Sequence, residues 1–135
     1  MSAKNVSVLI LYRTDSKILL QHRTKDAPTF PDCWAFFGGG IEEGESAEDA
    51  VKRESLEELG YELTSPCLFT TQRFVHQGNE HTMHVFVEKY NGGILILGEG
   101  QGMGWFLTGE TKELMMNDHD RSILQALGSV LKPGI

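Results

Sequence analysis

The chain has 135 residues, 40% of them hydrophobic and 23% charged, which is typical of one globular domain over residues 1–135. Twelve Lys and Arg against 19 Asp and Glu give a net charge of −7, which disfavours DNA or RNA as a partner because their phosphates would be repelled. No apolar run approaches the ~20 residues of a membrane span, and the apolar run at 8–12 is too short for a signal peptide. We therefore expect a cytoplasmic protein that binds neither nucleic acid polymers nor membranes.

The N-terminal part of the chain predicts a β-hairpin followed by a long loop. Apolar and β-branched residues fill 6–12, and a second apolar segment at 18–20 follows a short polar turn. The first of these strands is expected to be buried on both faces. Pro28 and Pro31 lie in the polar segment 23–34, and because proline disrupts regular structure, this segment is expected to form a surface loop.

A helix is predicted immediately after a glycine cluster at 38–44. Helix-favouring residues run from 47 to 59. Ser46 precedes them as a capping residue, Asp49 follows it by three positions, and Gly60 offers a C-terminal stop. These local signals predict a helix over 47–59.

The second half of the chain predicts further strands. Segments 67–75 and 82–90 are rich in Thr, Phe and Val and are joined through Gly78 and Asn79, which indicates another hairpin. Two shorter extended segments are expected at 94–97 and 103–107, with a glycine-rich loop between them.

A C-terminal helix is predicted from apolar residues at helical spacing. Either Asn117 or Asp118 can cap it. The apolar residues expected on its buried face are Ile123, Leu124, Leu127, Val130 and Leu131.

Three glutamates in the helix over 47–59 have a spacing that points to metal binding. Glu54, Glu57 and Glu58 lie at i, i+3 and i+4, so their side chains are expected to converge on one face, in line with the apolar Ala50 and Val51. Like charges at this spacing repel one another, more strongly when shielded from water. A divalent cation with oxygen ligands would supply a counter-charge. The alternative is a solvated, Glu-rich face.

Neighbouring residues extend this pattern. Arg53 lies four residues before Glu57 and can hold a carboxylate by an ion pair, although an exposed pair would have little energetic value. The glycines at 38–40 allow backbone to approach a ligand closely, and a carbonyl there could complete a metal shell. Because Mg²⁺ binds substrate phosphates through its remaining positions, the pattern favours phosphoryl chemistry.

The residues from 39 to 61 resemble the Nudix box, G-x5-E-x7-R-E-U-x-E-E-x-G-U, in which U is a bulky apolar residue. All seven fixed positions agree, namely Gly39, Glu45, Arg53, Glu54, Glu57, Glu58 and Gly60. Ser55 stands where an aliphatic residue is usual, and Tyr61 is larger and more polar than the common choice. The resemblance implies an α/β fold, the Nudix fold, in which a mixed β-sheet is sandwiched between helices (α/β/α) and the box forms a loop–helix–loop.

The resemblance also implies an activity, the hydrolysis of a nucleoside diphosphate linked to another moiety. It assigns Mg²⁺ or Mn²⁺ binding to the Gly38 carbonyl and to the carboxylates of Glu54, Glu57 and Glu58. Glu54 is the first choice for the general base and Glu57 the second. Two other charged residues at fixed positions, Glu45 and Arg53, are expected to orient these ligands.

Further site residues are expected outside the helix. Glu99 begins a glycine-rich segment similar to the one that supplies a further metal-binding or catalytic acid in nucleoside triphosphate pyrophosphohydrolases of this family; the alternative is a solvated side chain in a loop. Arg23 is a candidate for contacting the outer phosphates, and Gly39 and Gly40 for contacting the substrate. One aromatic residue is expected to touch the ligand, out of Phe30, Trp34, Phe37 and Phe74. Candidates for reading the edge of a base, if they are not simply helix caps, are Asn117, Asp118 and Asp120.

The sequence thus predicts a small Mg²⁺-dependent Nudix hydrolase that releases pyrophosphate from a nucleoside triphosphate. A nucleotide-sugar or dinucleotide pyrophosphatase stays open as an alternative, as does a catalytically silent nucleotide-binding module, although such modules typically lose acids that this chain keeps. A Ca²⁺-binding protein is disfavoured because the acids lie on a helix rather than on a flexible loop. Monomer and homodimer are both compatible with the sequence.

Overall fold

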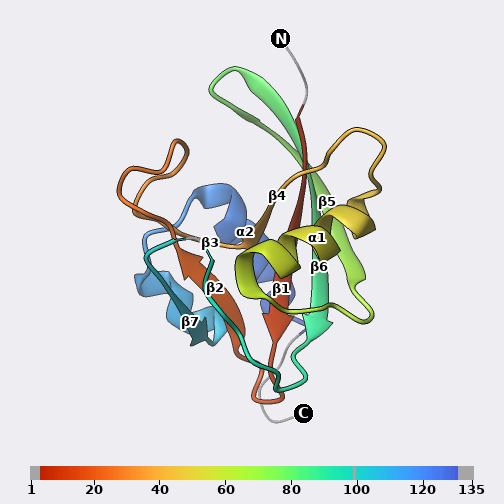
Figure 1. The fold of residues 1–135 in the computed structure, drawn as a ribbon. Helices are drawn as coiled ribbons and strands as arrows, with labels where there is room; N and C mark the ends of the chain where they lie inside the picture. The colour runs from red at the N-terminus through yellow and green to blue at the C-terminus, as the bar shows by residue number, and fades with distance from the viewer. Residues whose placement is uncertain (1–3, 99, 131–135) are drawn as a thin grey trace.

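A seven-stranded mixed sheet lies between two helices, α1 in front of it and α2 behind it in the view of Figure 1. The computed structural model describes residues 4–98 and 100–130. The strands are β1 (Lys4–Tyr12), β2 (Ile18–His22), β3 (Trp34–Ala35), β4 (Phe37–Gly40), β5 (Cys67–His76), β6 (Asn79–Lys89) and β7 (Gly102–Phe106). The helices are α1 (Ala47–Leu59), the short 3₁₀ helix η1 (Thr108–Glu113) and α2 (Asp118–Gly128).

Strand β1 organises the sheet. It runs parallel to β6 along its whole length, and β5 continues the sheet beyond β6 in antiparallel pairing. On its other side, β1 pairs with β4 from Val6↔Gly40 to Leu9↔Phe37, and with β2 only at Tyr12↔Ile18. The strands β3 and β7 both pair with β2. The predicted mixed sheet and both predicted hairpins are confirmed.

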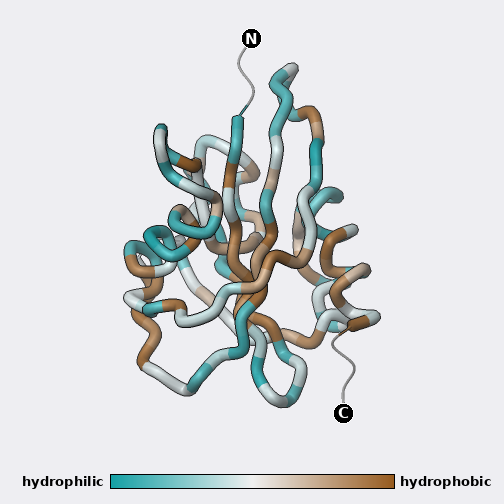
Figure 2. The backbone as a smooth tube through the Cα atoms, turned by 90° about the vertical axis from the view of Figure 1, so that its right-hand side faces the viewer, coloured by the Kyte–Doolittle hydropathy of each residue, from teal (hydrophilic) through white to brown (hydrophobic). Residues whose placement is uncertain are grey.

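Alternate residues of β1 fill two hydrophobic cores, one on each face of the sheet. Leu9 and Leu11 pack with residues of α1, whereas Val8 and Ile10 pack with residues of α2. Figure 2 shows hydrophobic residues gathered in the central strands between the helices. Because burial of one such side chain contributes about 1.5–3 kcal/mol, β1 has to be apolar on both faces, as its sequence predicted.

Local signals place α1 at the predicted boundaries. The Ser46 hydroxyl accepts a hydrogen bond from the Asp49 amide at 3.0 Å. Gly60 adopts the left-handed conformation, with φ of 62°, and its N–H closes the last turn on the Leu56 carbonyl. The cap of α2 is Asn117, whose side chain accepts from the Asp120 amide at 2.8 Å.

Three expectations about the secondary structure are wrong. Residues 39 and 40, expected in the loop at the start of the box, belong to β4, because pairing with β1 fixes a glycine segment that has little strand preference of its own. Residues 94–97 form neither helix nor strand; Ile96 instead donates its N–H to the Leu59 carbonyl at the end of α1. α2 ends at Gly128, so Val130 is 63% exposed, and Leu131 lies outside the described residues.

Within residues 4–98 and 100–130, no helix is both long and apolar enough to cross a membrane.

Candidate functional site

The helix α1, which carries the predicted acids and is called the acidic helix below, packs against β4 (Phe37–Gly40), the glycine strand. Glu58 of α1 is only 3% exposed, and its Oε1 accepts a hydrogen bond from the Gly38 amide at 2.7 Å. Gly38 has a φ of 142°, and a Cβ there would lie 2.7 Å from the Cα of Val8. A side chain at this position would therefore separate β4 from β1 and displace the strand that Glu58 holds.

Glu54 occupies space that a side chain on the glycine strand would fill. A Cβ at position 39 would lie 2.7 Å from Oε1 of Glu54 and 2.9 Å from its Cδ, which is closer than real Cβ atoms approach. The side chain of Glu54 is only 14% exposed. Gly39 thus forms a cradle for a carboxylate.

Arg53 connects the acids of the box. Its Nε and Nη2 donate to the two oxygens of Glu45 at 2.8 and 3.0 Å, and Nη2 also donates to the Gly40 carbonyl at 3.0 Å. Its Nη1 donates to Glu54 at 2.9 Å and lies 3.4 Å from both carboxylate oxygens of Glu57. Hydrogen bonding to Arg53 lowers the pKa of Glu45 to about 2, so Glu45 stays ionised. Arg53 thus makes the ion pair with a carboxylate that its position predicted, with Glu45 as one of its partners.

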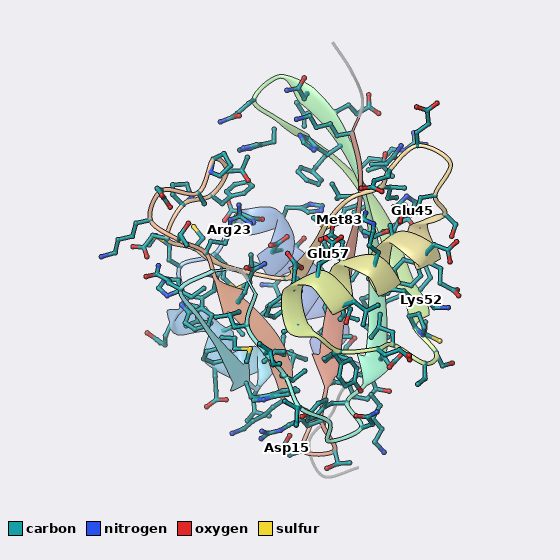
Figure 3. All side chains as sticks on the ribbon, in the orientation of Figure 1. Asp15, Arg23, Glu45, Lys52, Glu57 and Met83 are labelled. Atoms are coloured by element: carbon teal, nitrogen blue, oxygen red, sulfur yellow. The ribbon has the colours of Figure 1, made fainter. Side chains whose placement is uncertain are left out.

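The prediction that three carboxylates converge on a core-facing stripe is wrong for one of them. Glu58 is buried and Glu54 nearly so, but the side chain of Glu57 is 59% exposed. Figure 3 shows Glu57 and Lys52 on different sides of α1. Among the residues that the structure describes, no three His, Cys, Asp or Glu side chains are grouped to hold a metal ion. The guanidinium of Arg53 contacts both Glu54 and Glu57 and so supplies a counter-charge to these carboxylates.

The donor atoms nevertheless suit a hard divalent cation. The carboxylates of Glu54, Glu57 and Glu58 offer only oxygen, which Mg²⁺ and Mn²⁺ prefer over sulfur or nitrogen. The glycine cradle at position 39 keeps the Glu54 carboxylate close to the backbone of β4. The chemistry of these donor atoms therefore fits the implied metal.

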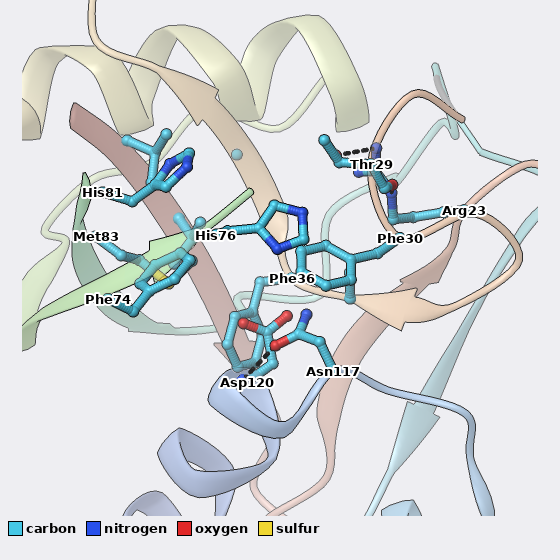
Figure 4. Close-up of a pocket in the computed structure, with 14 residues that line it drawn as sticks. Arg23, Thr29, Phe30, Phe36, Phe74, His76, His81, Met83, Asn117 and Asp120 are labelled. Carbon is cyan, nitrogen blue, oxygen red and sulfur yellow. Dashed lines mark hydrogen bonds between the residues drawn. The ribbon is translucent and has the colours of Figure 1, made fainter. Parts of the chain in front are cut away.

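A cavity of about 190 Å³ lies beside the glycine strand, shown in Figure 4. Its lining comes from β1, β3, β4, the loop before β3, the β5–β6 hairpin and the start of α2, and includes Arg23, Phe30, Gly38, Phe74, Asn117 and Asp120. Gly38 belongs to this lining and also donates its N–H to Glu58. One backbone position thus connects the cavity with the acidic helix.

The floor of the cavity contains an unusual carboxylate. Asp120 is 4% exposed, and its Oδ1 has no hydrogen-bond partner within the described part of the chain. Burial raises the pKa of Asp120 to about 6, against the opposing effects of the Asn117 hydrogen bond and the charge of Arg23. Figure 4 shows the carboxylate beside Asn117 and directed into the cavity. A buried polar atom without a partner is costly, so a ligand that donates a hydrogen bond here would be favoured.

Several residues predicted from the sequence line this cavity, and others do not. The candidates that line it are Arg23, Phe30, Phe74, Asn117 and Asp120, so two of the four aromatic candidates face the space. The other two aromatic candidates lie elsewhere: Phe37 is in the core, and Trp34 stacks on His22. Asp118 is exposed, and Glu99 lies outside the described residues. Of the two glycines expected to contact the substrate, Gly39 faces Glu54, and the Gly40 carbonyl accepts from Arg53.

Two histidines of the β5–β6 hairpin belong to the cavity although their sequence positions did not predict it. His76 and His81 line the cavity with Phe74 and Met83. Phe74 stacks on His81 at 5.0 Å between ring centroids, and His76 contacts Phe30 at 4.4 Å. The available signal was alternation, because residues two apart on a strand share a face and 74 pairs with 81.

Comparison with known proteins identifies the class to which this fold and this helix belong. A family model described as "NUDIX domain" matches residues 1–127, so the chain belongs to the Nudix family. The predicted box, the mixed sheet and its flanking helices agree with that assignment.

Individual relatives are similar over different shares of the chain. The nucleoside triphosphatase NudI of Escherichia fergusonii is 47% identical over 53 residues, which are 39% of this chain and only 38% of that protein's length. The solution structure of the E. coli ORF135 protein is 28% identical with a TM-score of 0.82, covering 96% of this chain and 91% of the other. A MutT NUDIX hydrolase from Burkholderia pseudomallei is 25% identical with a TM-score of 0.81, covering 93% and 98%.

Proposed function

We propose that this Nudix domain is a metal-dependent hydrolase that converts a nucleoside triphosphate to a nucleoside monophosphate and pyrophosphate. The observation that carries the proposal is the position of Gly38, which lines the cavity and is hydrogen-bonded to the acidic helix. A nucleotide with its base in the cavity would therefore have its phosphates near the carboxylates. The name of the E. fergusonii relative supports a nucleoside triphosphate as substrate.

The metal would be held by Glu54, Glu57, Glu58, the Gly38 carbonyl and Glu99. When bound, Mg²⁺ or Mn²⁺ polarises phosphoryl oxygens and makes a water molecule more acidic. Water attacks the α- or the β-phosphorus. The bond from that phosphorus to the oxygen that bridges the two atoms breaks, so a nucleoside monophosphate and pyrophosphate are released.

The residues of the chain then have separate roles. Glu54 takes the proton of the attacking water, because its carboxylate is shielded from solvent and fixed by Gly39 and Arg53. Arg53 and Glu45 hold this carboxylate in place through their two hydrogen bonds. Arg23 faces the cavity and is available to the outer phosphates.

The size of the cavity favours a single base. Sites that enclose a whole drug-sized ligand usually have ~300–1,000 Å³. About 190 Å³ is enough for only part of a nucleotide, which leaves the phosphates outside, toward α1. Aromatic rings at its rim and the polar groups of Asn117 and Asp120 at its floor suit a flat heterocycle with hydrogen-bonding edges.

A nucleotide panel assayed with Mg²⁺, with phosphate detected after pyrophosphatase treatment, tests this proposal. The wild-type chain should hydrolyse at least one nucleoside triphosphate. Glu54→Gln should lower kcat by ~10² or more, since it removes a base or ligand from a fixed position. Glu48→Gln is the matched control, because Glu48 lies on the same helix, 54% exposed, and contacts only Lys52 among the described ion pairs, at 3.2 Å. Nucleotide binding without turnover would instead identify a silent nucleotide-binding module.

A further inference from the structure

The loop between β2 and β3 forms one wall of the cavity and has a strained backbone. Phe30 has a φ of 46° and Asp32 a φ of 60°, and neither is glycine. Non-glycine residues hold such angles only where their surroundings impose them. Phe30 and Thr29 face the cavity, and Thr29 also accepts from the guanidinium of Arg23 through its carbonyl at 2.9 Å. The shape of this loop therefore sets the position of two cavity residues, Arg23 and Phe30.

Hydrophobic packing does not account for that shape. None of the side chains in 24–33 is buried. Open space flanks the loop on both sides, with the 190 Å³ cavity on one side and a second cavity of about 380 Å³ on the other. Arg23 lines both cavities, and Pro28 and Gly100 line the second. Apart from the contact of Phe30 with His76, polar contacts therefore hold the loop.

Three polar side chains meet at the base of the loop. The Asp32 carboxylate lies 3.0 Å from Nε2 of His22 and accepts from Nε2 of Gln101 at 2.9 Å. Gln101 also donates to the Arg23 carbonyl at 2.8 Å, and its backbone N–H donates to the His22 carbonyl at 2.8 Å. The Gln101 side chain thus touches both ends of the loop.

Aromatic packing on the sheet holds His22 in place. The His22 ring stacks on Trp34 at 4.7 Å with the planes 5° apart, and Trp34 meets Phe106 of β7 edge to face at 5.1 Å. His22 and Trp34 are paired residues of β2 and β3. The strained Asp32 is therefore tied to a rigid part of the fold.

We infer that His22, Asp32 and Gln101 form a polar clasp that holds the 24–33 loop and thereby positions Arg23 and Phe30 for binding the nucleotide. This inference rests on the proposed function. Gln101 is a positioning residue: it does not line the nucleotide cavity and acts through the loop. The clasp should affect substrate binding more than the chemical step. The acids of α1 belong to a different element, and the backbone hydrogen bond from the Gln101 N–H to the His22 carbonyl, close in sequence to Glu99, does not depend on the Gln101 side chain.

Steady-state kinetics of Gln101→Ala, with Gln125→Ala as control, test this inference. Gln101→Ala should raise KM about tenfold and leave kcat within about twofold, because it loses two hydrogen bonds, one of them to a carboxylate. Gln125 is exposed on α2 and lies outside the nucleotide cavity, so its variant should match the wild type. Asp32→Asn should largely preserve KM, since Asn tolerates positive φ and keeps an acceptor oxygen. Asp32→Gly relieves the strain but removes the acceptor, so its KM should rise as in Gln101→Ala.

Amide hydrogen exchange provides a readout that does not depend on catalysis. The Asp32 N–H is bonded to the Thr24 carbonyl and the Arg23 N–H to the Cys33 carbonyl, so both should exchange faster in Gln101→Ala than in the wild type. If the wild type hydrolyses no nucleotide, the proposed function fails, while faster exchange in the variant still supports the clasp. Unchanged exchange would overturn the clasp. An unchanged KM in an active enzyme, or a loss confined to kcat, would overturn its positioning role.

Discussion

Gly39→Ala should weaken metal binding without preventing the chain from folding. In the structure, the added methyl carbon would lie 2.7 Å from Oε1 and 2.9 Å from Cδ of Glu54, whereas ordinary contacts begin near 3.4 Å. The clash involves the end of a flexible side chain and no backbone atom, so Glu54 can turn away. Overpacking of this kind costs about 1–3 kcal/mol. We expect Gly39→Ala to fold but to lose the carboxylate from its cradle.

The two neighbouring glycines provide matched controls with different expected outcomes. Gly40→Ala places its methyl group in open space, so its stability and its response to metal should equal those of the wild type. Gly38→Ala introduces a Cβ that overlaps the Ser7 carbonyl of β1, at a φ of 142°. This variant should fail to fold, because backbone rather than a side chain would have to move.

Calorimetry with Mg²⁺ and with chelator measures the difference. If Mg²⁺ binds only the folded state, saturation at about 100 times Kd adds ~2.7 kcal/mol to the free energy of unfolding. The unfolding entropy of a chain this size is roughly 280 cal/mol/K, so Mg²⁺ should raise Tm by about 10 °C in the wild type and in Gly40→Ala. In Gly39→Ala, the metal-free Tm should fall by about 4–11 °C and the Mg²⁺ shift should nearly vanish. A Mg²⁺ shift in Gly39→Ala equal to that of Gly40→Ala would refute the role of Glu54 in metal binding.

Two further variants test the site from other sides. Glu57→Gln should change the metal-free stability by less than ~0.5 kcal/mol, because the side chain is 59% exposed, yet it should abolish the Mg²⁺ shift; retention of the shift, as expected for Glu48→Gln, would remove Glu57 from the metal site. Because burial raises the pKa of Asp120 to about 6, the folded chain holds this proton more tightly than the unfolded chain does. The resulting stabilisation, about 3 kcal/mol, is present below about pH 4 and is lost as the pH rises through about 6. Asp120→Asn should therefore be more stable than the wild type near pH 7. In urea titrations, its free energy of unfolding should fall less between about pH 4 and about pH 7. If the free energies of unfolding of the two proteins change in parallel with pH, the raised pKa of Asp120 is contradicted.

The helix α1 was predictable because its signals are local. Ser46, Asp49 and Gly60 lie within a turn of the ends they define, and the caps observed are those the sequence predicted. The grouping of Glu54, Glu57 and Glu58 on one helix was predictable for the same reason, from their spacing. Their exposure was not predictable, because whether Glu57 points to solvent depends on what packs against the helix and on the reach of Arg53.

The glycine strand and the cavity could not be predicted in the same way, because both depend on distant parts of the chain. Pairing with β1 makes Phe37–Gly40 a strand, and residues 6–9 are about thirty positions away. The cavity brings together a loop near Phe30, a hairpin near His76 and the start of α2 at Asp120. Sequence reasoning proposed members of each group singly, but only the fold places them around one space.

The central claim is that the acidic helix directs hydrolysis of a triphosphate at the bond that releases pyrophosphate. Hydrolysis of the best nucleoside triphosphate in ¹⁸O-labelled water, followed by mass spectrometry of the products, tests it most directly. The expected products are a nucleoside monophosphate and pyrophosphate, with the label in one of the two, and kcat should be ~10² or more lower in Glu54→Gln. A nucleoside diphosphate together with ¹⁸O-labelled inorganic phosphate would contradict it.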